Sequence, residues 1–194
     1  PDHMTEIILA SASPQRRTLL AGLGVEFSVD PSSFVESHFE ETDPARRALL
    51  LSKVKAKDVA DRHKHAVIIG CDTLVVSPNG TLLEKPKDVD DARRMIALQS
   101  GGTSMVYSGL TVIDVAGNAH SDLSTNRVTF RTLTEADIEW WISTNQWKDR
   151  SGAFQIDGAG QLMSSNLEGD WPGVVGFPVV LLGELLRKAG GVFP

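Results

Sequence analysis

The sequence predicts an α/β protein, because strand patterns alternate with helix patterns along the chain. Residues 7–9 are apolar and lead through a turn of small residues into a helix that begins at Pro14. Residues 66–70 form an unbroken apolar run, which is typical of a strand that is buried on both faces. Helix patterns over residues 44–63 and 88–99 stand on either side of that run in the sequence, which gives the alternation.

The whole chain limits the class of protein. Its 194 residues suffice for one domain or two small lobes, and its net charge of −6 argues against a nucleic-acid polymer as the main partner. Cys71 is the only cysteine, so an internal disulfide is impossible and a reducing compartment is the simplest interpretation. No apolar run approaches the roughly 20 residues that a membrane span needs. We therefore expect a cytoplasmic protein without membrane contact, and we interpret residues 1–3, before Met4, as an addition to its natural start.

The first strand, turn and helix form a candidate binding site. Ser13 is placed to cap the helix, and Pro14 at the first helical position gives up an N–H group that has no helical partner. The remaining N–H groups and the helix dipole favour an anion, and Arg16 and Arg17 add donors that suit phosphate. Basic residues in a first turn oppose the dipole, so these arginines either serve a polyanion or are simply solvated.

The next helix brings a lysine toward the core. Residues 25–29 predict a strand, and Glu36 lies in the polar, acidic segment that follows it. Asp43 predicts the cap of a helix that extends to about residue 63. Lys55 falls on the inward stripe of this helix, where a lysine must extend to solvent or meet an anion.

An acidic residue follows the buried strand. Asp72 comes two residues after the run at 66–70, where sheet enzymes keep catalytic carboxylates. A structural aspartate that accepts bonds from backbone N–H groups is the equal alternative. Residues 78–80 predict a hairpin turn, and its return strand at 81–83 carries Lys85 back toward Asp72.

The second half of the chain continues the alternation and then becomes irregular. We expect a helix over residues 88–99, two long strands joined at residues 116–118, and a helix capped by Thr134. Residues 145–176 are rich in glycine and are expected to be irregular, which suits a backbone that approaches a ligand. A last amphipathic helix begins at Phe177.

Three other side chains could belong either to the core or to a site. Trp141 lies on the apolar face of its helix and is expected in the core, whereas Trp171 in the glycine-rich segment is a candidate wall for a binding site. Cys71 has no histidine beside it in the sequence, so we expect a buried thiol and not a nucleophile.

Absent motifs exclude several chemistries. The chain lacks a GxxxxGK[ST] phosphate loop, a GxSxG elbow and an HExxH motif, and its five histidines have no zinc-ligand spacing. What remains is a set of cations suited to phosphates and carboxylates suited to Mg²⁺ and to water activation, as phosphoanhydride hydrolysis requires. The set is Arg16, Arg17, Lys55, Lys85, Lys87, Glu36, Asp72 and Glu84.

Seven motifs in a fixed order give the chain its resemblance to a known family. They are SASPQRR (11–17), Glu36 in its acidic segment, KVKA (53–56), GCDTLVV (70–76), LEKPKD (83–88), DRSGAFQIDG (149–158) and LEGDWPGVVGFP (167–178). With these motifs, from Ile7 to about Lys188, the sequence resembles the Maf family of nucleoside triphosphate pyrophosphatases. The fold of that family is related to that of the inosine triphosphate pyrophosphatases.

The resemblance implies a fold and a reaction. The fold is α/β, with a mixed, twisted sheet flanked by helices in two lobes around a central cleft, all in one domain over residues 4–194. The reaction is hydrolysis of a nucleoside triphosphate to a monophosphate and pyrophosphate with a divalent metal, Mg²⁺ or Mn²⁺. The resemblance also suggests a homodimer.

By position, the resemblance makes Asp72 the general base that activates water, with Lys55 and Lys85 as further catalytic residues. The residues that match the family's contacts to the triphosphate or its metal are Ser11, Arg16, Glu36, Lys55 and Lys85. Carboxylate chemistry makes Glu36 and Asp72 the expected metal ligands.

Three further positions concern the base of the nucleotide. The chain has Gln15, Thr73 and Asp157. Family members selective for thymidine and uridine triphosphates typically carry Arg, Thr and Gln there, and the 7-methylguanosine triphosphate group typically carries Trp, Gln and Glu. Thr73 agrees with the pyrimidine group, Asp157 is acidic like the second group, and Gln15 fits neither. We expect a modified or mixed set of nucleotides as substrates.

Two alternative functions stay open. The first is a nucleotide-binding regulator of septation or division without turnover, and the second is a purine-selective enzyme that removes inosine or xanthosine triphosphates. Asp72, Lys55 and Lys85 together favour an enzyme, because binding alone does not need a carboxylate that activates water.

Overall fold

The strands of the computed structural model, which describes residues 5–190, form one mixed sheet. They are β1 (Ile7–Leu9), β2 (Ser28–Val29), β3 (Val67–Val76), β4 (Leu82–Leu83), β5 (Thr103–Ile113), β6 (Ala119–Phe130) and β7 (Ser164–Glu168). The order is β2-β1-β3-β5-β6-β7, and β4 pairs with β3. β1 is parallel to β2 and β3, whereas the β3–β4 and β6–β7 pairs are antiparallel. The prediction of an α/β fold with a mixed sheet is confirmed.

Helices connect these strands, and the chain divides into two compact units. The α-helices are α1 (Pro14–Ala21), α2 (Pro44–Ala60), α3 (Val89–Gln99), α4 (Glu135–Ser143), α5 (Trp171–Val175) and α6 (Val179–Lys188). Three short 3₁₀ helices are η1 (Glu36–His38), η2 (Ser151–Ala153) and η3 (Gly158–Leu162). The first unit holds the described chain up to Asp72, residues 108–124 and the chain from Gly176; the second holds residues 73–107 and 125–175.

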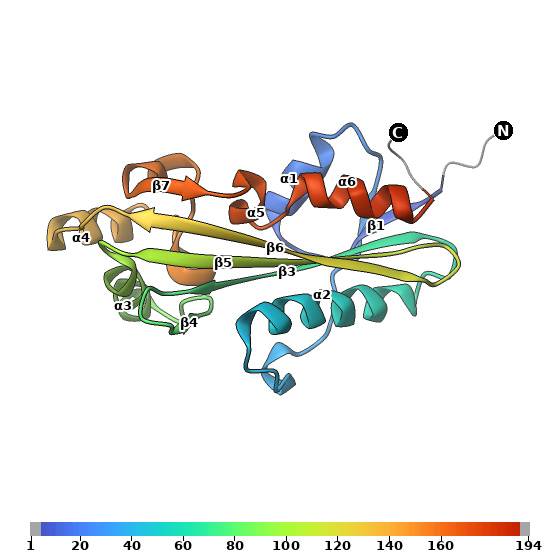
Figure 1. The fold of residues 1–194 in the computed structure, drawn as a ribbon, viewed down its shortest axis with the longest axis horizontal. Coiled ribbons are helices and arrows are strands. Elements are labelled where there is room, and N and C mark those ends of the chain that lie inside the picture. Colours follow the sequence, from blue (N-terminus) through green and yellow to red (C-terminus); the bar gives the residue numbers. More distant parts are fainter. Residues whose placement is uncertain (1–4, 191–194) are drawn as a thin grey trace. The chain divides into compact units, whose positions relative to one another are not determined.

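In the first unit, helices cover both faces of the sheet. Figure 1 shows α2 on one face and α1 with α6 on the other. Beneath α2, buried Ala56 and Val59 pack against Ile8 and Ile68 of the central strands. On the opposite face, the buried leucines of α1 and α6 pack on residues of β1, β3 and β5 whose side chains point the other way. The alternation of side chains along each strand thus supplies both layers of the core.

Two glycines let α2 lie unusually close to the sheet. A Cβ atom built on Gly70 of β3 would stand 2.5 Å from the carbonyl oxygen of Ser52, and one on Gly109 of β5 would overlap the backbone of Ala48. Just beside them, the hydroxyls of Ser52 and Thr111 form a buried hydrogen bond of 2.8 Å between helix and strand. Glycine is therefore required at both positions by the approach of a backbone, not by a turn.

This close approach gives a testable prediction. Replacing Gly109 with alanine is expected to lower the free energy of unfolding by about 1–3 kcal/mol, because the added methyl group forces α2 away from the sheet. Urea denaturation followed by circular dichroism measures the change. The control is Gly183→Ala in α6, where a Cβ atom would meet nothing within 4 Å and alanine favours the helix. Equal stability of Gly109→Ala and the wild type would contradict the packing described.

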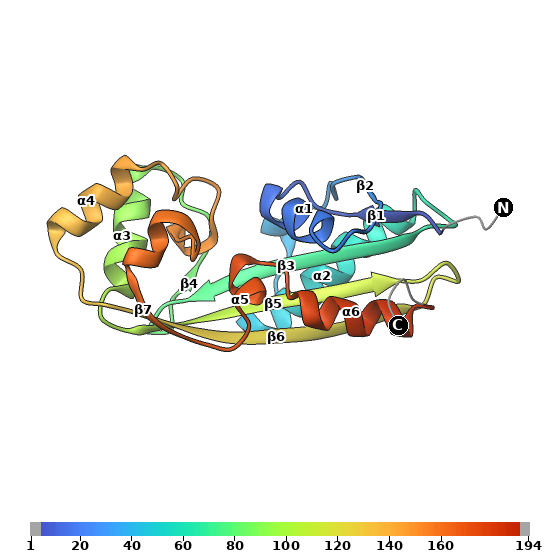
Figure 2. The same cartoon turned by 90° about the horizontal axis from the view of Figure 1, so that it is seen from above.

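The second unit has its own core, which α3 and α4 share. Figure 2 shows these two helices next to one another. Trp141 of α4 is completely buried, and its indole N–H donates a 2.9 Å hydrogen bond to the carbonyl of Ala153. Phe130 at the end of β6 packs on Phe154 with ring centroids 4.6 Å apart. The prediction that Trp141 belongs to the core is confirmed.

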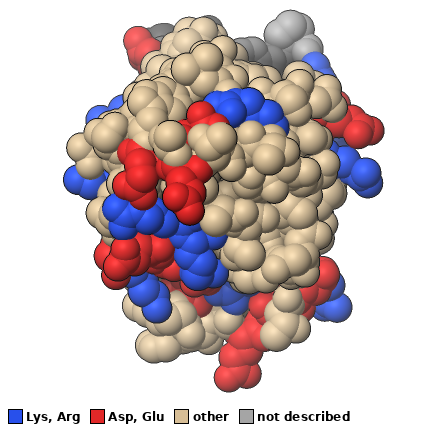
Figure 3. All heavy atoms as spheres, turned by 90° about the vertical axis from the view of Figure 1, so that its left-hand side faces the viewer, with Lys and Arg blue, Asp and Glu red and all other residues tan. Residues whose placement is uncertain are grey.

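The outer surface of α3 and α4 carries interleaved charges. Arg93 forms ion pairs with Asp90 and with Glu139, and Arg94 pairs with Asp91. Figure 3 looks at the side of Figure 1 that carries these helices and shows acidic and basic side chains next to one another. Such exposed pairs contribute little to stability. Within residues 5–190, no helix is long and apolar enough to cross a membrane.

Several elements differ from the sequence prediction. β3 continues without a break to Val76, so Asp72 lies inside the strand and not at its end. The strand predicted at 25–29 is reduced to β2, and α2 stops at Ala60. The segment predicted as irregular contains the edge strand β7, whose polar sequence SSNLE has no strand pattern and is held by its backbone pairing with β6. Residues 1–4 and the interpretation of 1–3 lie outside the described residues.

Candidate functional site

The turn between β1 and α1 is organised by serine hydroxyls. Ser13 caps the helix by accepting a 3.4 Å bond from the backbone N–H of Arg16, as predicted. The Arg16 guanidinium donates from Nη1 to Ser11 Oγ at 3.0 Å and from Nε to the carbonyl of Gly176 at 2.9 Å. Gln15 accepts a 3.2 Å bond from the Ser13 hydroxyl through Oε1. The turn therefore presents a fixed cation beside a helix N-terminus, which is an arrangement suited to phosphate oxygens.

The central feature of the first unit is a lysine shared by two carboxylates. Lys55 Nζ lies 2.6 Å from Asp72 Oδ1 and 2.5 Å from Glu36 Oε1. The side chains differ in exposure, with 5% for Asp72, 14% for Lys55 and 49% for Glu36. The prediction that Lys55 must extend to solvent or meet an anion is thus resolved in favour of the anion. We refer to Glu36, Lys55 and Asp72 as the carboxylate–lysine cluster.

Asp72 also has an oxygen that no group in residues 5–190 satisfies. Within these residues its buried Oδ2 atom has no hydrogen-bond partner. The alternative of a structural aspartate held by backbone N–H groups does not describe this oxygen, because such an aspartate has its acceptors filled. A buried carboxylate oxygen without a donor is costly, and a bound water, a cation or a substrate proton would satisfy it.

The donor chemistry of the carboxylate–lysine cluster suits a hard divalent cation. Glu36 and Asp72 both supply carboxylate oxygens to this cluster. No group of three or more acidic, histidine or cysteine residues capable of holding a metal occurs in the described part of the chain. Mg²⁺ is commonly held by only one or two carboxylates together with substrate phosphates, so two carboxylates fit this ion.

Cys71 contributes to the same region as a structural thiol. It is fully buried, and its Sγ donates to the carbonyl of Gly176 at 3.2 Å, the same carbonyl that accepts from Arg16. The expectation of a buried thiol is confirmed. Because the Gly176 carbonyl accepts from both Cys71 and Arg16, it links β3 and α1 to the segment before α6. The φ of Gly176 is +121°.

The second unit groups the other predicted residues around the glycine-rich segment. Ser151 Oγ donates to the carbonyl of Thr73 at 3.1 Å, and the Gly152 N–H donates to the carbonyl of Glu84, next to Lys85, at 3.0 Å. These two bonds place the start of the motif at residues 149–158 beside the strand that carries Thr73 and beside the Lys85 segment. Gly152 has a φ of +71°, which explains the glycine at this turn.

Asp157 has the second unsatisfied carboxylate oxygen. Its Oδ1 atom is buried without a partner, and the residue precedes η3 without capping it. Nearby Arg150 donates from Nε to Gln155 Oε1 at 3.0 Å. Burial lowers the pKa of Arg150, and the charges of Asp157 and Asp149 partly offset that effect. Sequence reasoning did not single out Arg150, Ser151 or Gln155, although all three lie in the motif at residues 149–158.

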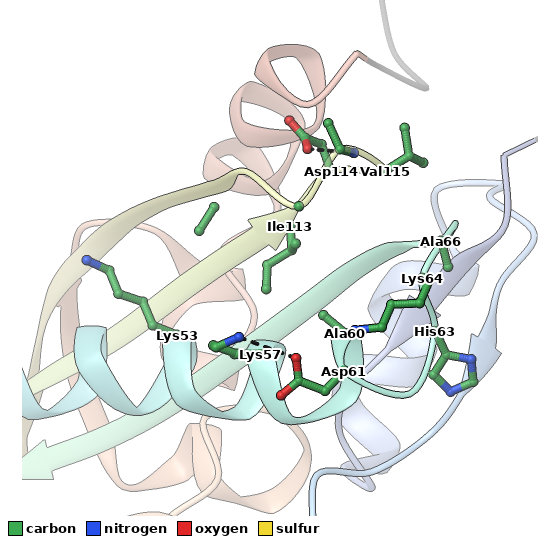
Figure 4. A pocket seen from close by; sticks show the side chains of 13 residues that line it. Lys53, Lys57, Ala60, Asp61, His63, Lys64, Ala66, Ile113, Asp114 and Val115 are labelled. Atoms are coloured by element: carbon green, nitrogen blue, oxygen red, sulfur yellow. Dashed lines mark hydrogen bonds and ion pairs between the residues drawn. The ribbon is translucent and has the colours of Figure 1, made fainter.

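A separate hollow in the first unit contains none of the predicted site residues. It measures about 520 Å³ and lies between the C-terminal half of α2 and the β5–β6 turn (Figure 4). Lys53, Lys57 and Lys64 stand around an aliphatic floor, and Lys57 is paired with Asp61 at 3.3 Å. None of the buried, unpartnered polar atoms found in residues 5–190 belongs to this hollow.

The histidine that follows α2 has a carboxylate partner. His63 is half-buried and contacts Asp30 through Nε2 at 2.6 Å. Hydrogen bonds from Arg62 and then from His63 lower the pKa of the Asp30 carboxyl.

Comparison with known proteins identifies the class to which this fold and these motifs belong. The family described as "Maf-like protein" matches residues 6–189, and the chain belongs to this family. A dTTP/UTP pyrophosphatase of Deinococcus radiodurans is 45% identical over 184 residues, which cover 95% of this chain and 93% of the relative. The dTTP/UTP pyrophosphatase of Moorella thermoacetica is 42% identical, with 96% of both chains covered. That of Pyrococcus furiosus is 38% identical, with 95% of both covered.

Solved structures show a more distant likeness. A dITP/XTP pyrophosphatase from Mycobacterium abscessus has 14% identity and a TM-score of 0.43, with 65% of this chain and 74% of that chain covered. A HAM1 protein from Coxiella burnetii has 13% identity and a TM-score of 0.45, with 66% and 73% covered.

Proposed function

We propose that this protein hydrolyses nucleoside triphosphates to the monophosphate and pyrophosphate, with UTP and dTTP as preferred substrates. The observation that carries the reaction is the buried Asp72 carboxylate, with one oxygen held by Lys55 and the other without a partner. The dTTP/UTP pyrophosphatases that share 38–45% of its sequence support the substrate class. The earlier expectation of a modified or mixed set of nucleotides becomes the competing outcome.

The chemistry follows from the unsatisfied oxygen of Asp72. Asp72 Oδ2 accepts a proton from a water molecule, whose oxygen attacks the α-phosphorus. The bond from that phosphorus to the bridging oxygen breaks, and pyrophosphate leaves with the bond's electron pair. Lys55 orients the Asp72 carboxylate, since its ammonium lies 2.6 Å from Oδ1.

We propose that three predicted residues bind the phosphates. Ser11 and Arg16 form the fixed donor group at the start of α1, and we propose that they bind phosphate oxygens. Lys85 is proposed to bind the triphosphate as well. Mg²⁺ or Mn²⁺, when held by Glu36 and Asp72, supplies neutralisation of phosphate charge.

Recognition of the base is assigned to Gln15, Thr73 and Asp157. The unsatisfied Asp157 Oδ1 is an acceptor, and the N3–H group of uracil or thymine is a donor that fits it. A carboxylate lacks the N–H donors that a glutamine would offer to the carbonyl oxygens of the base. We therefore propose that discrimination between UTP or dTTP and other nucleotides is weaker than a glutamine at position 157 would give.

A substrate panel tests the proposal. The purified protein is assayed for pyrophosphate release from UTP, dTTP, CTP, 5-methyl-UTP, 7-methyl-GTP and ITP with Mg²⁺ or Mn²⁺. UTP and dTTP are expected to give the highest kcat/KM, and Asp157→Gln is expected to widen the margin over the others. If 7-methyl-GTP or ITP gave the highest kcat/KM, the proposed preference for UTP and dTTP would be wrong. Binding of nucleotides without turnover of any would favour a regulator instead.

We propose that residues 4–194 form one catalytic domain that works in the cytoplasm, as a homodimer and without a nucleic-acid polymer or membrane as partner. Light scattering of the purified chain measures the assembly.

A further inference from the structure

The segment that carries Glu36 lies outside the sheet and is tied to α2 at several points. Figure 1 shows the chain passing beneath α2 before it turns back into that helix. At the near end, Asp58 accepts a 2.8 Å bond from the Ser32 hydroxyl and another of 2.8 Å from the Ser33 N–H. These bonds lower the pKa of Asp58, the hydroxyl of Ser32 having the largest effect. The Glu36–Lys55 ion pair lies between this tie and the next one.

At the far end, a single arginine holds the segment. Arg47 donates from Nη1 to the carbonyl of Phe39 at 2.6 Å and to the carbonyl of Glu41 at 3.2 Å. It also donates from Nη2 to the carbonyl of Glu36 itself at 3.2 Å. The guanidinium lies over the Phe39 ring at 5.6 Å from its centroid. One side chain therefore fixes three backbone carbonyls of a six-residue stretch.

Burying the Arg47 guanidinium costs free energy, and a purely structural role does not account for that cost. It is only 8% exposed, and its buried Nε atom has no partner. It forms no ion pair with a carboxylate in the described part of the chain. It also lies near the N-terminus of α2, whose first turn holds no acidic residue, so its charge opposes the helix dipole. A buried cation whose bonds all go to one segment suggests that the exact path of that segment matters.

We infer that Arg47 is a positioning residue for the proposed reaction: it fixes the backbone of residues 36–41 so that the Glu36 carboxylate meets Lys55. The inference rests on the proposed function. Arg47 is not proposed to touch the nucleotide. It acts through Glu36, whose side chain is 49% exposed and pairs with Lys55, so its position depends on the path of its backbone. A loose Glu36 also leaves Lys55 free to pair with Asp72 alone.

The test compares Arg47→Met with Arg46→Met. Methionine keeps much of the side-chain volume and removes all three donors. The control is the adjacent arginine, whose side chain is 73% exposed and which touches only Glu41 at 3.6 Å. We expect Arg47→Met to lose roughly 10- to 100-fold in kcat on UTP with a smaller change in KM, because misplacement by about 1 Å can cost that much. Arg46→Met is expected to keep the wild-type rate.

A double-mutant cycle separates positioning from general damage. In the Glu36→Gln background, Arg47→Met is expected to cause little further loss, because the group that it positions is already inactive. The same fold-loss in both backgrounds, or a wild-type rate for Arg47→Met, overturns the inference. Arg47→Lys keeps the charge but cannot reach three carbonyls, so we expect an intermediate rate, and it replaces the methionine variant if that one fails to fold.

Hydrogen exchange keeps this test independent of the proposed function. Amide exchange over residues 36–41 is expected to be at least severalfold faster in Arg47→Met than in the wild type, with β1 and β3 unchanged. Unchanged exchange over residues 36–41 overturns the inference even if the enzyme is active. If the wild type hydrolyses no triphosphate, the proposed function fails, and faster exchange still shows that Arg47 fixes this segment.

Discussion

Asp72→Asn is expected to lower kcat/KM for the best triphosphate substrate by roughly 10²- to 10⁴-fold, the range that a lost general base costs. Asparagine has the shape of aspartate and keeps an oxygen that can accept from Lys55, so the cluster keeps its geometry. What it loses is the ability of the second oxygen to take a proton. That oxygen is the buried Oδ2 atom without a partner.

The measurement must separate chemistry from binding and folding. Pyrophosphate release gives kcat/KM, titration with a non-hydrolysable triphosphate analogue gives the Kd, and thermal unfolding gives the Tm. The Tm and the Kd measured without a divalent metal are expected to change little. The matched control is Asp114→Asn, which alters an aspartate paired with His120 at the β5–β6 turn. Near wild-type pyrophosphate release by folded Asp72→Asn would falsify the assignment of the base.

The starts of the helices are the features that the sequence predicted most accurately. Ser13, Asp43, Asp88 and Thr134 each accept a bond from a backbone N–H in the first turn, and Thr134 forms the complete capping box with Asp137. Caps are local, because the side chain and its partner lie three residues apart, so a sequence contains all that is needed.

Pairing between distant strands could not be predicted in the same way. β7 has no strand pattern of its own and exists because its backbone bonds to β6. Asp72 was predicted at a strand end because a polar residue interrupts an apolar run, yet β3 continues through it. The interruption is tolerated because Lys55 arrives from α2 to pair with the carboxylate. Both features depend on contacts between residues far apart in the chain.

The same distinction between local features and contacts of distant residues applies to the candidate site. Lys55 was singled out by its place on the inward stripe of a helix, and its contact with an anion follows from that place. Glu36 was one candidate carboxylate in an acidic segment, and the family resemblance selected it for the site. Arg47 was not marked at all, because it lies next to Arg46 in a polar stretch, and its role depends on where three carbonyls fall. The catalytic and binding roles of all the predicted site residues stay predictions.

Lys55→Met is expected to abolish turnover and to destabilise the fold, which makes it the second large effect. Removing the ammonium leaves the 4%-exposed Asp72 without its counter-charge. Breaking a buried pair from one side commonly costs about 3–5 kcal/mol, because the remaining charge is neither solvated nor paired. Methionine is chosen because its length is similar and its side chain suits the apolar stripe on which Lys55 lies.

The double variant Lys55→Met/Asp72→Asn distinguishes a charge effect from a packing effect. If the loss comes from the unpaired carboxylate, neutral asparagine is expected to restore most of the free energy of unfolding, measured by urea denaturation at pH 7. Turnover is not expected to return, because the base is then absent as well. Lys53→Met on the same helix, where the lysine is exposed and lines the separate hollow, is the control and is expected to change neither quantity. Stability that remains low in the double variant would show that the Lys55 side chain supports α2 by packing, and wild-type stability of Lys55→Met would show that Asp72 does not need its partner.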